Sequence, residues 1–517
     1  MYCHDCWWSD DWNPISYGSN YDFSRPFFSQ FQDLFYVVPA QGLAYQNAVN
    51  SEYINHVANA KNSYLVFGAH DIENVAYAKD AIYTKDSFDI SYTSHSELCY
   101  ETLDCVRCFK VFYSRKSEDC RESTLLLDGR NCSNCMASST IRNKTYCIFN
   151  KRFIKEDYFQ KVKELDLGSF RNLEKLKQEF EKHALKYPRR YATIRNSVNV
   201  VGDDIFNAKN CYRCFFLTNG AENCKYCVIL SEAVKDSYDV VAAAFRWSEL
   251  LYEIASGIGQ RLFFGVRIWN SFDIFLSYDC HGSNNLFGCV GLRNKSYCIL
   301  NKQYTKDEYM NLVSRIMKHM DEMPYIDKKG RIYKYGEFFP PELSPFSYNE
   351  TIAQEYFPLT KAEALEKGYS WKDPEPRNYR IQIPNDKLPD HIKDVKDDIV
   401  GQVIECAHQG KCNEQCTEAY KIIPQELQFL RRMNLPLPCL CPNCRHYQRI
   451  KQRNPLKLWH RKCQCAGAKS ENQVYQNTAD HIHHNKDEHC PNEFETTYAP
   501  ERPEIVYCED CYLKEVV

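Results

Sequence analysis

The residues of this chain whose types and spacing could do chemistry are its cysteines, 27 among 517 residues. A zinc ion takes four soft ligands in a tetrahedron, and short cysteine knuckles supply such ligands in pairs. Two cysteine pairs some 25 residues apart predict a four-cysteine zinc site of ribbon or treble-clef type. The predicted ligands are Cys412, Cys416, Cys441 and Cys444, with Cys406 and Cys439 as possible substitutes.

A second set of cysteines lies closer to the C-terminus and predicts a second zinc ion. Residues 493–498 and 504–507 alternate apolar and polar side chains, which predicts a two-stranded hairpin that leads into a Cys-x-x-Cys knuckle. The predicted ligands are Cys490, Cys508 and Cys511, and either Cys465 or Cys463 completes the four. A cluster of histidines lies in the same region, and we favour a solvated loop for it over additional zinc ligands: His481, His483, His484 and His489.

The first residues of the chain repeat the last knuckle. Tyr2-Cys3-His4-Asp5-Cys6-Trp7 has the same pattern as Tyr507-Cys508-Glu509-Asp510-Cys511-Tyr512. We expect Cys3 and Cys6 to be the second knuckle of a further ribbon whose first half precedes this sequence. The alternative is that another cysteine pair of the chain completes the site.

The only strongly basic stretch lies between the two cysteine sets. No Asp or Glu occurs from Leu427 to Ser470. Basic groups on a rigid zinc scaffold can bind phosphates, and aromatic side chains can stack on bases, so we predict nucleic-acid contact. The alternative is a solvated helix that pairs with acidic residues near 394–398. The predicted contact residues are Arg431, Arg432, Arg445, Arg449, Lys451, Arg453, Lys457, Trp459, Arg461 and Lys462.

Enzymatic signals are weak in this sequence. Asp480-His-Ile-His-His lies between cysteine pairs and is faintly similar to a histidine–metal nuclease motif, but the expected Asn and second His spacing is not met. No paired carboxylates stand out from turn residues, and no Gly-rich phosphate loop occurs. We therefore lean towards a non-enzymatic protein, and a metal-dependent hydrolase is the least favoured class.

Composition places these motifs in a reducing compartment. The net charge is −3, so no global field favours nucleic acid or a membrane. Residues 1–30 lack the apolar core of a secretory signal, and no apolar run is long enough to cross a bilayer. The sequence predicts a cytoplasmic protein without a membrane partner, whose thiols stay reduced. The alternative is a secreted disulfide protein.

The elements that must position the motifs come from an internal duplication. IRNKTYCIFNKRFIKEDYFQKV at 141–162 matches LRNKSYCILNKQYTKDEYMNLV at 292–313. KDSFDI from Lys85 matches KDSYDV from Lys235, and SELCYE from Ser96 matches SELLYE from Ser248. Residues of roughly 59–160 and 207–312 are therefore two copies of one unit.

Each copy has a finer rhythm of twelve residues, as in Asn62, Asn74 and Asp86. Short β-prone segments alternate with Asn, Asp, Ser and Gly turns. This predicts a mainly β protein with short helices, built on a duplicated right-handed parallel β-solenoid, with a β-sandwich as the alternative. The cysteines at 99–298 then pack in the interior, because Cys99 aligns with Leu251; zinc knuckles are the alternative.

These patterns divide the chain into five predicted parts. They are an N-terminal segment with the partial knuckle (1–58), a first solenoid copy with a helical closer (59–190), a second copy with its closer (191–320), a Pro-rich connector packed on a neighbour (321–400), and two zinc modules (401–517).

Several stretches resemble a family of uncharacterised Cys-rich proteins predicted from uncultured, small-genome bacteria. The resembling segments start at Trp7 (WWSDDWNP), Tyr21 (YDFSRPFF) and Arg502 (RPEIVYCEDCY), together with the two RNK-x-YC-I closers. The resemblance covers nearly the whole chain. It implies that the tryptophan motif usually follows a ribbon half, and it implies no function.

Together, the sequence predicts a zinc-stabilised binding protein that contacts DNA, RNA or a ribonucleoprotein through residues 431–469. The runner-up is a protein-interaction scaffold that uses the face of the solenoid.

Overall fold

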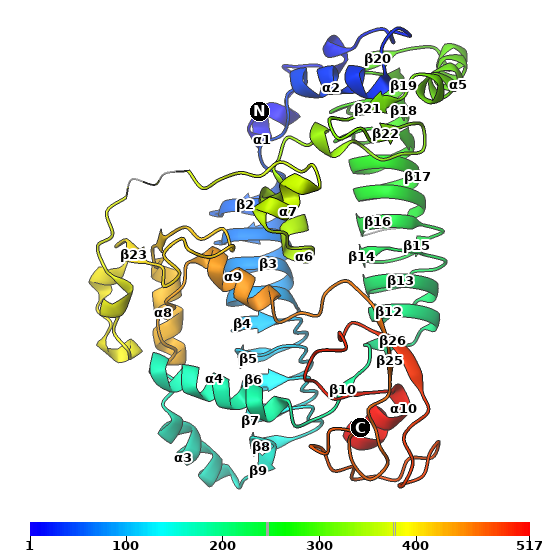
Figure 1. Cartoon of the computed structure of the whole chain (residues 1–517). Coiled ribbons are helices and arrows are strands. Elements are labelled where there is room, and N and C mark those ends of the chain that lie inside the picture. The colour runs from blue at the N-terminus through cyan, green and yellow to red at the C-terminus, as the bar shows by residue number, and fades with distance from the viewer. Residues whose placement is uncertain (244–247, 376, 378) are drawn as a thin grey trace.

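The computed structural model describes residues 1–243, 248–375, 377 and 379–517. Two large, mostly parallel sheets make up the β structure, and short helices surround them (Figure 1). We call residues 45–152 the first stack and residues 194–303 the second stack. Among the described residues, no helix has the length and apolar character needed to cross a bilayer.

The first stack pairs each residue with the one twelve positions later, as in Glu52 with Tyr64 and Phe88 with Tyr100. This parallel pairing fits the rhythm seen in the sequence and differs from the antiparallel pairing of a β-sandwich. The strands are β1 (Tyr45–Val49), β2 (Glu52–Lys61), β3 (Tyr64–Ser94), β4 (Tyr100–Leu103), β5 (Phe109–Phe112), β6 (Arg121–Leu127), β7 (Ser133–Ser139), β8 (Thr145–Ile148) and β9 (Lys151–Arg152).

We call each turn of the chain, from one residue to its partner in the next strand of the stack, a rung. The second stack repeats this arrangement, but some of its rungs are longer than twelve residues. Asn210 donates to Asn223 thirteen positions on, and Tyr238 pairs with Tyr252 fourteen positions on. These longer rungs explain why the number of positions that separates matching segments is not constant: Lys85 matches Lys235, whereas Ser96 matches Ser248. The strands are β11 (Ile194–Arg195), β12 (Val198–Phe206), β13 (Lys209–Leu217), β14 (Val228–Leu230), β15 (Val234–Lys235), β16 (Tyr238–Ala243), β17 (Ser248–Phe275), β18 (Asn284–Phe287), β19 (Ser296–Ile299) and β20 (Lys302–Gln303).

A period of three residues lies beneath the period of twelve. Leu98, Glu101 and Asp104 have φ values of 56°, 51° and 53°, and every third residue turns the chain in the same way along most of the stack. The residue that follows each turn points inward, as Cys99 and Cys105 do, both with no exposed surface. Four such triplets complete a rung, so the interior is narrow and admits Cys, Ser, Ala, Val, Ile and Leu.

The fourteen cysteines of the two stacks occupy these inward positions and are all buried. Their thiols lie against interior backbone carbonyls: the Sγ of Cys99 is 3.6 Å from the carbonyl oxygen of Glu97 and 3.8 Å from that of Cys108. Serine at the equivalent position of the preceding rung accepts a backbone N–H, as Ser87 does from Cys99 at 3.0 Å. The structure therefore gives these cysteines the interior packing position that the sequence predicts.

Helices begin where the sequence predicts the closers. α3 (Lys155–Leu165) and α4 (Phe170–Ala184) pack on the end of the first stack, and α5 (Lys306–Glu322) packs on the end of the second. The N-terminal helices α1 (His4–Trp8) and α2 (Phe27–Val37) also belong to the second stack's end, where Phe27 packs on Phe287 with ring centroids 5.3 Å apart. The five domain boundaries stay a prediction.

The remaining elements are short and connect or cover the stacks. In the connector, Phe339 packs on Phe31 with ring centroids 4.9 Å apart, so this segment is held against the N-terminal helices. The elements are β10 (Arg189–Arg190), β21 (Tyr325–Ile326), β22 (Ile332–Tyr333), α6 (Ala353–Tyr356), α7 (Lys361–Glu366), β23 (Ile404–Glu405), β24 (Ala419–Tyr420), α8 (Pro424–Met433), α9 (Pro442–Ile450), β25 (Trp459–Lys462), β26 (Glu493–Thr496), β27 (Val506–Tyr507) and α10 (Glu509–Val516).

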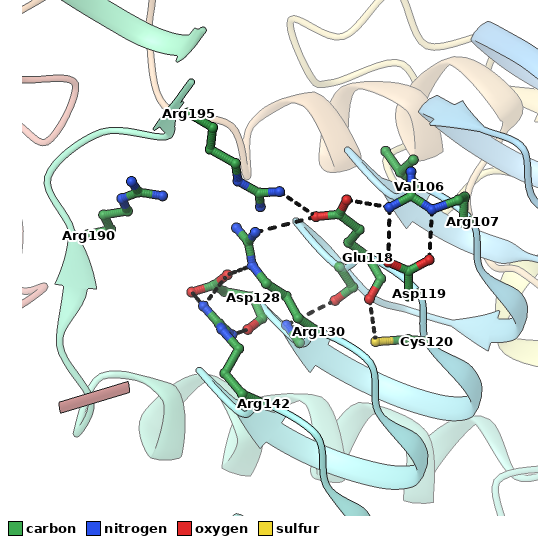
Figure 2. A network of polar contacts seen from close by, with 12 residues as sticks. Val106, Arg107, Glu118, Asp119, Cys120, Asp128, Arg130, Arg142, Arg190 and Arg195 are labelled. Carbon is green, nitrogen blue, oxygen red and sulfur yellow. Dashed lines mark hydrogen bonds and ion pairs between the residues drawn. The ribbon is translucent and has the colours of Figure 1, made fainter. Parts of the chain in front are cut away.

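The two stacks stand side by side and are joined by a network of charged side chains (Figure 1, Figure 2). Glu118 of the first stack accepts hydrogen bonds from Arg107 at 2.5 Å and from Arg195 of β11 at 2.8 Å. A cavity of about 110 Å³ adjoins this network, and residues of both signs line it, including Lys116 and Asp203. The charges balance one another across the cavity, so it has no clear preference for an anion or a cation.

Candidate metal centres and a candidate binding face

The first candidate metal centre lies where α9 begins. Cys406 follows β23, Cys416 precedes β24, Cys441 caps α9, and Cys444 lies in its first turn. All four are buried, and the Sγ atoms of Cys406 and Cys444 are 3.9 Å apart. Ligands about 2.3 Å from a tetrahedral zinc ion lie about 3.8 Å from one another. This group of four cysteines could therefore hold a metal ion such as zinc.

Backbone N–H groups also point at these sulfurs, as they do in zinc knuckles. The backbone N of Cys441 is 3.3 Å from the Sγ of Cys406, and the N of Thr417 is 3.5 Å from the Sγ of Cys441. Crowding of the thiols lowers the pKa of Cys441 and raises the pKa of Cys444, in both cases chiefly through contact with Cys406. Such a group carries negative charge that a bound cation would neutralise.

The sequence predicts Cys412 as a ligand of this site and Cys406 as a possible substitute, whereas the buried group contains Cys406 and not Cys412. Cys406 belongs to the buried four-cysteine group. Cys412 is half-buried, and its Sγ lies 3.7 Å from that of Cys444 in an overlapping group with His408 and Glu414. Cys439 belongs to neither group. The short β23–β24 pair brings Cys406 next to Cys416, a pairing that cysteine spacing alone does not reveal.

The second candidate metal centre lies at the start of α10. Its four cysteines are Cys463, Cys490, Cys508 and Cys511, all buried. The Sγ atoms of Cys490 and Cys508 are 3.7 Å apart, and the backbone N of Cys508 is 3.2 Å from the Sγ of Cys463. This second group could likewise hold a metal ion such as zinc. Of the two alternatives that the sequence leaves open for the fourth position, Cys463 lies in this buried group, and Cys465 lies in a neighbouring group with His481 and His484.

The predicted hairpin leading into this knuckle is wrong. β26 pairs antiparallel with β25, and β27 pairs parallel with β10, so the two segments pair with other strands. Val506 and Tyr507 have no exposed surface, a degree of burial that an isolated hairpin on the surface would not give them. The antiparallel pairing of β25 with β26 brings the chain after Lys462 close to Cys490, which explains why Cys463 joins this group.

The histidines favoured as a solvated loop are for the most part not solvated. The side chain of His481 is 2% exposed, and its Nδ1 lies 3.3 Å from the Sγ of Cys465. His483 and His484 are half-buried and also contact cysteine sulfurs, while His489 is exposed. Three of the four histidines are therefore directed at the second metal centre.

The N-terminal knuckle copies the local geometry of the C-terminal one. The backbone N of Cys6 is 3.5 Å from the Sγ of Cys3, and the backbone N of Cys511 is 3.5 Å from the Sγ of Cys508. Cys3 and Cys6 are exposed and lie apart from both buried four-cysteine groups. Their role as zinc ligands stays a prediction.

The predicted nucleic-acid surface is corrected by burial. Arg445, Arg449 and Arg461 are 3%, 2% and 9% exposed, and the side chain of Arg453 is 6% exposed. The guanidinium of Arg453 lies 3.2 Å from Asp104, inside the interface between α9 and the stacks. These four arginines are used inside the protein and cannot reach a phosphate backbone. A one-dimensional count of basic residues does not reveal this, because Arg445, Arg449 and Arg453 have acidic partners hundreds of positions away in Asp89 and Asp104.

Most of the other residues in that set also have partners within the chain. Arg431 pairs with Asp397 and Lys451 with Glu414, while Lys462 lies 3.3 Å from Glu493. The remaining three residues are Arg432, Lys457 and Trp459, and they form contacts between cations and aromatic rings. Lys457 is 5.0 Å from the ring of Trp459, and Arg432 is 5.9 Å from that of Phe429.

The buried arginines lie against an aromatic face of the first stack. A ladder of aromatic rings runs up its outer side: Tyr64, Tyr77, Phe88, Tyr100 and Phe112. α8 and α9 cover this ladder (Figure 1). Phe429 of α8 lies 4.9 Å from Phe88 and 6.0 Å from Tyr100, and Arg445 of α9 lies over Tyr77 at 4.6 Å.

Two carboxylates next to the ladder hold the arginines of α9. Asp89 accepts from Arg445 at 2.5 Å and from Arg449 at 2.9 Å. Glu101 lies 3.4 Å from Arg449. The two arginines are four residues apart, which places them on one face of the helix. The acids of the first stack are thus neutralised by a covering helix.

The second stack carries the same ladder and the same acids without this cover. Its rings are Tyr212, Tyr226, Tyr238, Tyr252 and Phe264, with centroids 5.2 to 6.0 Å apart. Tyr212, Tyr226 and Tyr238 are 42%, 38% and 37% exposed, whereas Tyr77 is 5% exposed. Asp239 and Glu253 follow Tyr238 and Tyr252 as Asp89 and Glu101 follow Phe88 and Tyr100.

Asp239 and Glu253 have no cationic partner among the residues that the structure describes. Within the residues that the structure describes, neither Asp239 nor Glu253 forms an ion pair, although each has the position that binds arginine in the first stack. Burial raises the pKa of Glu253 to about 7, with additional repulsion from Asp239 and Glu337. We call Tyr212, Tyr226, Tyr238, Asp239 and Glu253 the open face.

Comparison with known proteins identifies no family. No family model and no curated protein matches the chain. One solved structure, of a protein from Desulfovibrio desulfuricans G20 described as an acetyltransferase, aligns with 11% identity over 56% of this chain and 84% of that chain. Its TM-score of 0.11 is too low to support an argument about fold or activity.

Proposed function

We propose that this protein is a zinc-stabilised scaffold that binds another polypeptide through the open face of the second stack. In this proposal the two buried four-cysteine groups each hold a zinc ion, in modules of ribbon or treble-clef type. The two stacks are right-handed β-solenoids that present flat ladders of side chains. The first zinc ion fixes α9 on the first stack, because Cys441 and Cys444 begin that helix.

One observation carries the proposal: the chain covers the ladder in one copy, whereas Tyr212, Tyr226 and Tyr238 are exposed in the other. Exposed aromatic side chains in a contiguous row, rimmed by charge, are typical of protein interaction sites. The open tyrosines each carry an apolar ring and a hydroxyl, which suits a surface that is alternately free and bound.

The covered copy indicates the chemistry of the partner. α9 meets the first stack with Arg445 and Arg449, one turn apart, and with the first of these over a tyrosine ring. Asp239, Glu253 and the tyrosine rings offer the same acids and aromatic surface on the open face. The proposed partner is therefore a helix that carries two arginines four residues apart, whose guanidinium groups would pair with the acids and stack on the rings.

Charge argues against nucleic acid at the open face, because the carboxylates of Asp239 and Glu253 would repel phosphates. The basic stretch that motivated nucleic-acid binding is largely occupied with internal partners. These contacts support the protein scaffold better than nucleic-acid binding.

A peptide titration tests the proposal. The probe is a helix-stabilised, fluorescein-labelled peptide of residues 442–453 that carries Cys444→Ser, added to the full-length protein and followed by anisotropy. Its own site on the first stack is filled by α9, so saturable binding would report the open face. The matched control peptide carries Arg445→Gln and Arg449→Gln.

The proposal expects the control peptide to bind at least about tenfold more weakly, since charged partners of a docked helix contribute more than about 1.4 kcal/mol. The protein variant with Asp239→Asn and Glu253→Gln should lose the same factor, whereas Glu232→Gln, an exposed acid elsewhere on the second stack, should not. Equal binding of both peptides, or no saturable binding, would contradict the proposal.

A further inference from the structure

The loop at residues 466–489 is long for a segment without helix or strand. As whole residues, positions 471–489 are exposed or half-buried. The side chain of His481 is nevertheless only 2% exposed. Loops of this length are uncommon in compact proteins unless a ligand or a functional role orders them. Yet its histidines lie in one place, against cysteine sulfurs.

His481 has its ring orientation and tautomer set by a buried carboxylate. Its Nε2 lies 2.9 Å from Glu515, whose side chain has no exposed surface. Glu515 also accepts from the backbone N and hydroxyl of Thr478, each at 2.8 Å. A carboxylate held in this way keeps the proton on Nε2, which leaves the lone pair on Nδ1. Metal-ligating histidines typically show this arrangement.

His484 is oriented by a backbone carbonyl in the same sense. Its Nδ1 donates to the carbonyl oxygen of Asn485 at 3.1 Å, which leaves the lone pair on Nε2. That Nε2 lies 3.0 Å from the Nδ1 of His481. The two nitrogens therefore face each other at hydrogen-bond distance, an arrangement that either a shared proton or a bound metal ion satisfies.

Two sulfurs complete the set of four. The Sγ of Cys465 is 3.3 Å from His481 Nδ1 and 3.5 Å from His484 Nε2, and the Sγ of Cys511 is 3.4 Å from His484 Nε2. Nitrogen and sulfur ligands of one tetrahedral zinc ion lie about 3.5 Å apart. Asn477 donates its side-chain N–H to the Sγ of Cys465 at 3.1 Å, a hydrogen bond that suits a ligating thiolate.

We propose that Cys465, His481, His484 and Cys511 bind a zinc ion of their own, so that the C-terminal module holds two ions. This inference rests on the proposed zinc binding and adds a site to it. Cys511 also belongs to the four-cysteine group, and it either bridges the two ions or is replaced there by His483. The Nε2 of His483 lies 3.2 Å from the Sγ of Cys490 and 3.4 Å from that of Cys511.

Zinc counting on the purified full-length chain tests the site. The proposal expects about three zinc ions per chain by mass spectrometry, one at residues 406–444 and two at residues 463–511. The variant with His481→Gln and His484→Gln should retain about two ions. The matched control is His489→Gln, an exposed histidine of the same loop, and it should retain all ions.

X-ray absorption at the zinc edge gives a second readout on the unaltered protein, so that misfolding of a variant cannot decide the result. The proposal expects a nitrogen shell near about 2.0 Å, in a ratio of about two nitrogens to ten sulfurs, or about three to nine if His483 ligates. Two ions per chain with an all-sulfur shell would overturn the added site and leave the two four-cysteine sites standing.

The other outcomes are equally informative. Two ions per chain that fall to one in the histidine double variant would mean that the module has a single mixed site, which contradicts the inference. A chain that binds no zinc would contradict the proposed function itself.

Discussion

The two stacks share one design on their outer faces and use it differently. In the first stack Phe88, Tyr100 and the carboxylate of Asp89 are sealed under α8 and α9. In the second stack Tyr238 and Asp239 occupy the equivalent positions and are exposed. A duplicated unit thus gives one copy whose aromatic face is covered from within the chain and one whose equivalent residues Tyr238 and Asp239 are exposed.

The covered face of the first stack contributes to the stability of the fold, whereas the open face of the second stack is the one for which we propose a partner. Buried charges are costly unless they are paired, so the first face depends on its covering helix. On the second face Asp239 is exposed and Glu253 is half-buried, and neither forms an ion pair with a described residue. The predictions below test this contrast, beginning with the largest expected effect.

The matched pair Asp89→Asn and Asp239→Asn tests the contrast directly. Asp89 has no exposed side-chain surface and holds two arginines, so its loss should destabilise the protein by about 3–5 kcal/mol. Asp239→Asn should change stability by less than about 0.5 kcal/mol. Both residues have positive φ, which Asn accepts well, so the backbone does not confound the comparison. Denaturant unfolding measures both, and similar losses would contradict the account.

Removal of the covering aromatic side chain should have the next largest effect. Phe429 is 3% exposed and packs on three rings of the first ladder, so Phe429→Ala should cost about 3 kcal/mol. Tyr226→Ala, at the open ladder, should cost less than about 1 kcal/mol. The contrast would fail if the exposed tyrosine proved as important for stability as the buried phenylalanine.

Zinc removal should affect the two stacks unequally. With Cys441→Ser and Cys444→Ser the first metal centre is lost, and α9 loses its anchored start. Hydrogen exchange should then increase at least about tenfold in α8 and α9 and at the rungs around Tyr77 and Tyr100. The rungs around Tyr226 should exchange as before, and an equal increase in both stacks would argue against a local clamp.

The pH dependence of peptide binding should be the smallest effect. Because the pKa of Glu253 is raised to about 7 in the folded protein, this carboxyl gains its charge only as the pH rises through that value. Affinity for the peptide of residues 442–453 with its two arginines, which we call the arginine peptide, should increase by up to about tenfold between pH 6 and 8. The variant Glu253→Gln should abolish that increase. Affinity that falls over this range would have the wrong sign.

The same pKa predicts the pH dependence of stability for the unbound face. The folded state binds this proton more tightly than the unfolded chain, whose ordinary value is 4.5. Glu253 therefore contributes stability that is fully present below that value and is lost as the pH rises towards 7.

Periodicity within the chain predicted the framework well. The match between the KDSFDI and KDSYDV segments revealed the duplication, and the twelve-residue spacing of Asn62, Asn74 and Asp86 predicted the rungs, because these side chains hydrogen-bond to one another up the stack. The triplet period was missed, since Cys, Ser, Ala, Val and Leu alternate freely at the inward positions and hide their common role.

The candidate sites were predicted by residue type more than by partner. Cysteine clusters indicated two metal centres, but which cysteine joins which group depends on strand pairing at β23–β24 and β25–β26. The arginines of α9 were read as a surface because their partner, Asp89, lies more than 350 positions earlier. Long-range ion pairs of this kind cannot be found from local composition.

The most direct test of the account is hydrogen exchange of the full-length protein with and without the arginine peptide. The account predicts that binding protects the rungs that carry Tyr226, Tyr238 and Tyr252 and leaves the rungs around Tyr77 and Tyr100 unchanged. Protection confined to the first stack, or no protection in either stack at saturating peptide, would contradict the claim that the second stack presents the open copy of a binding face.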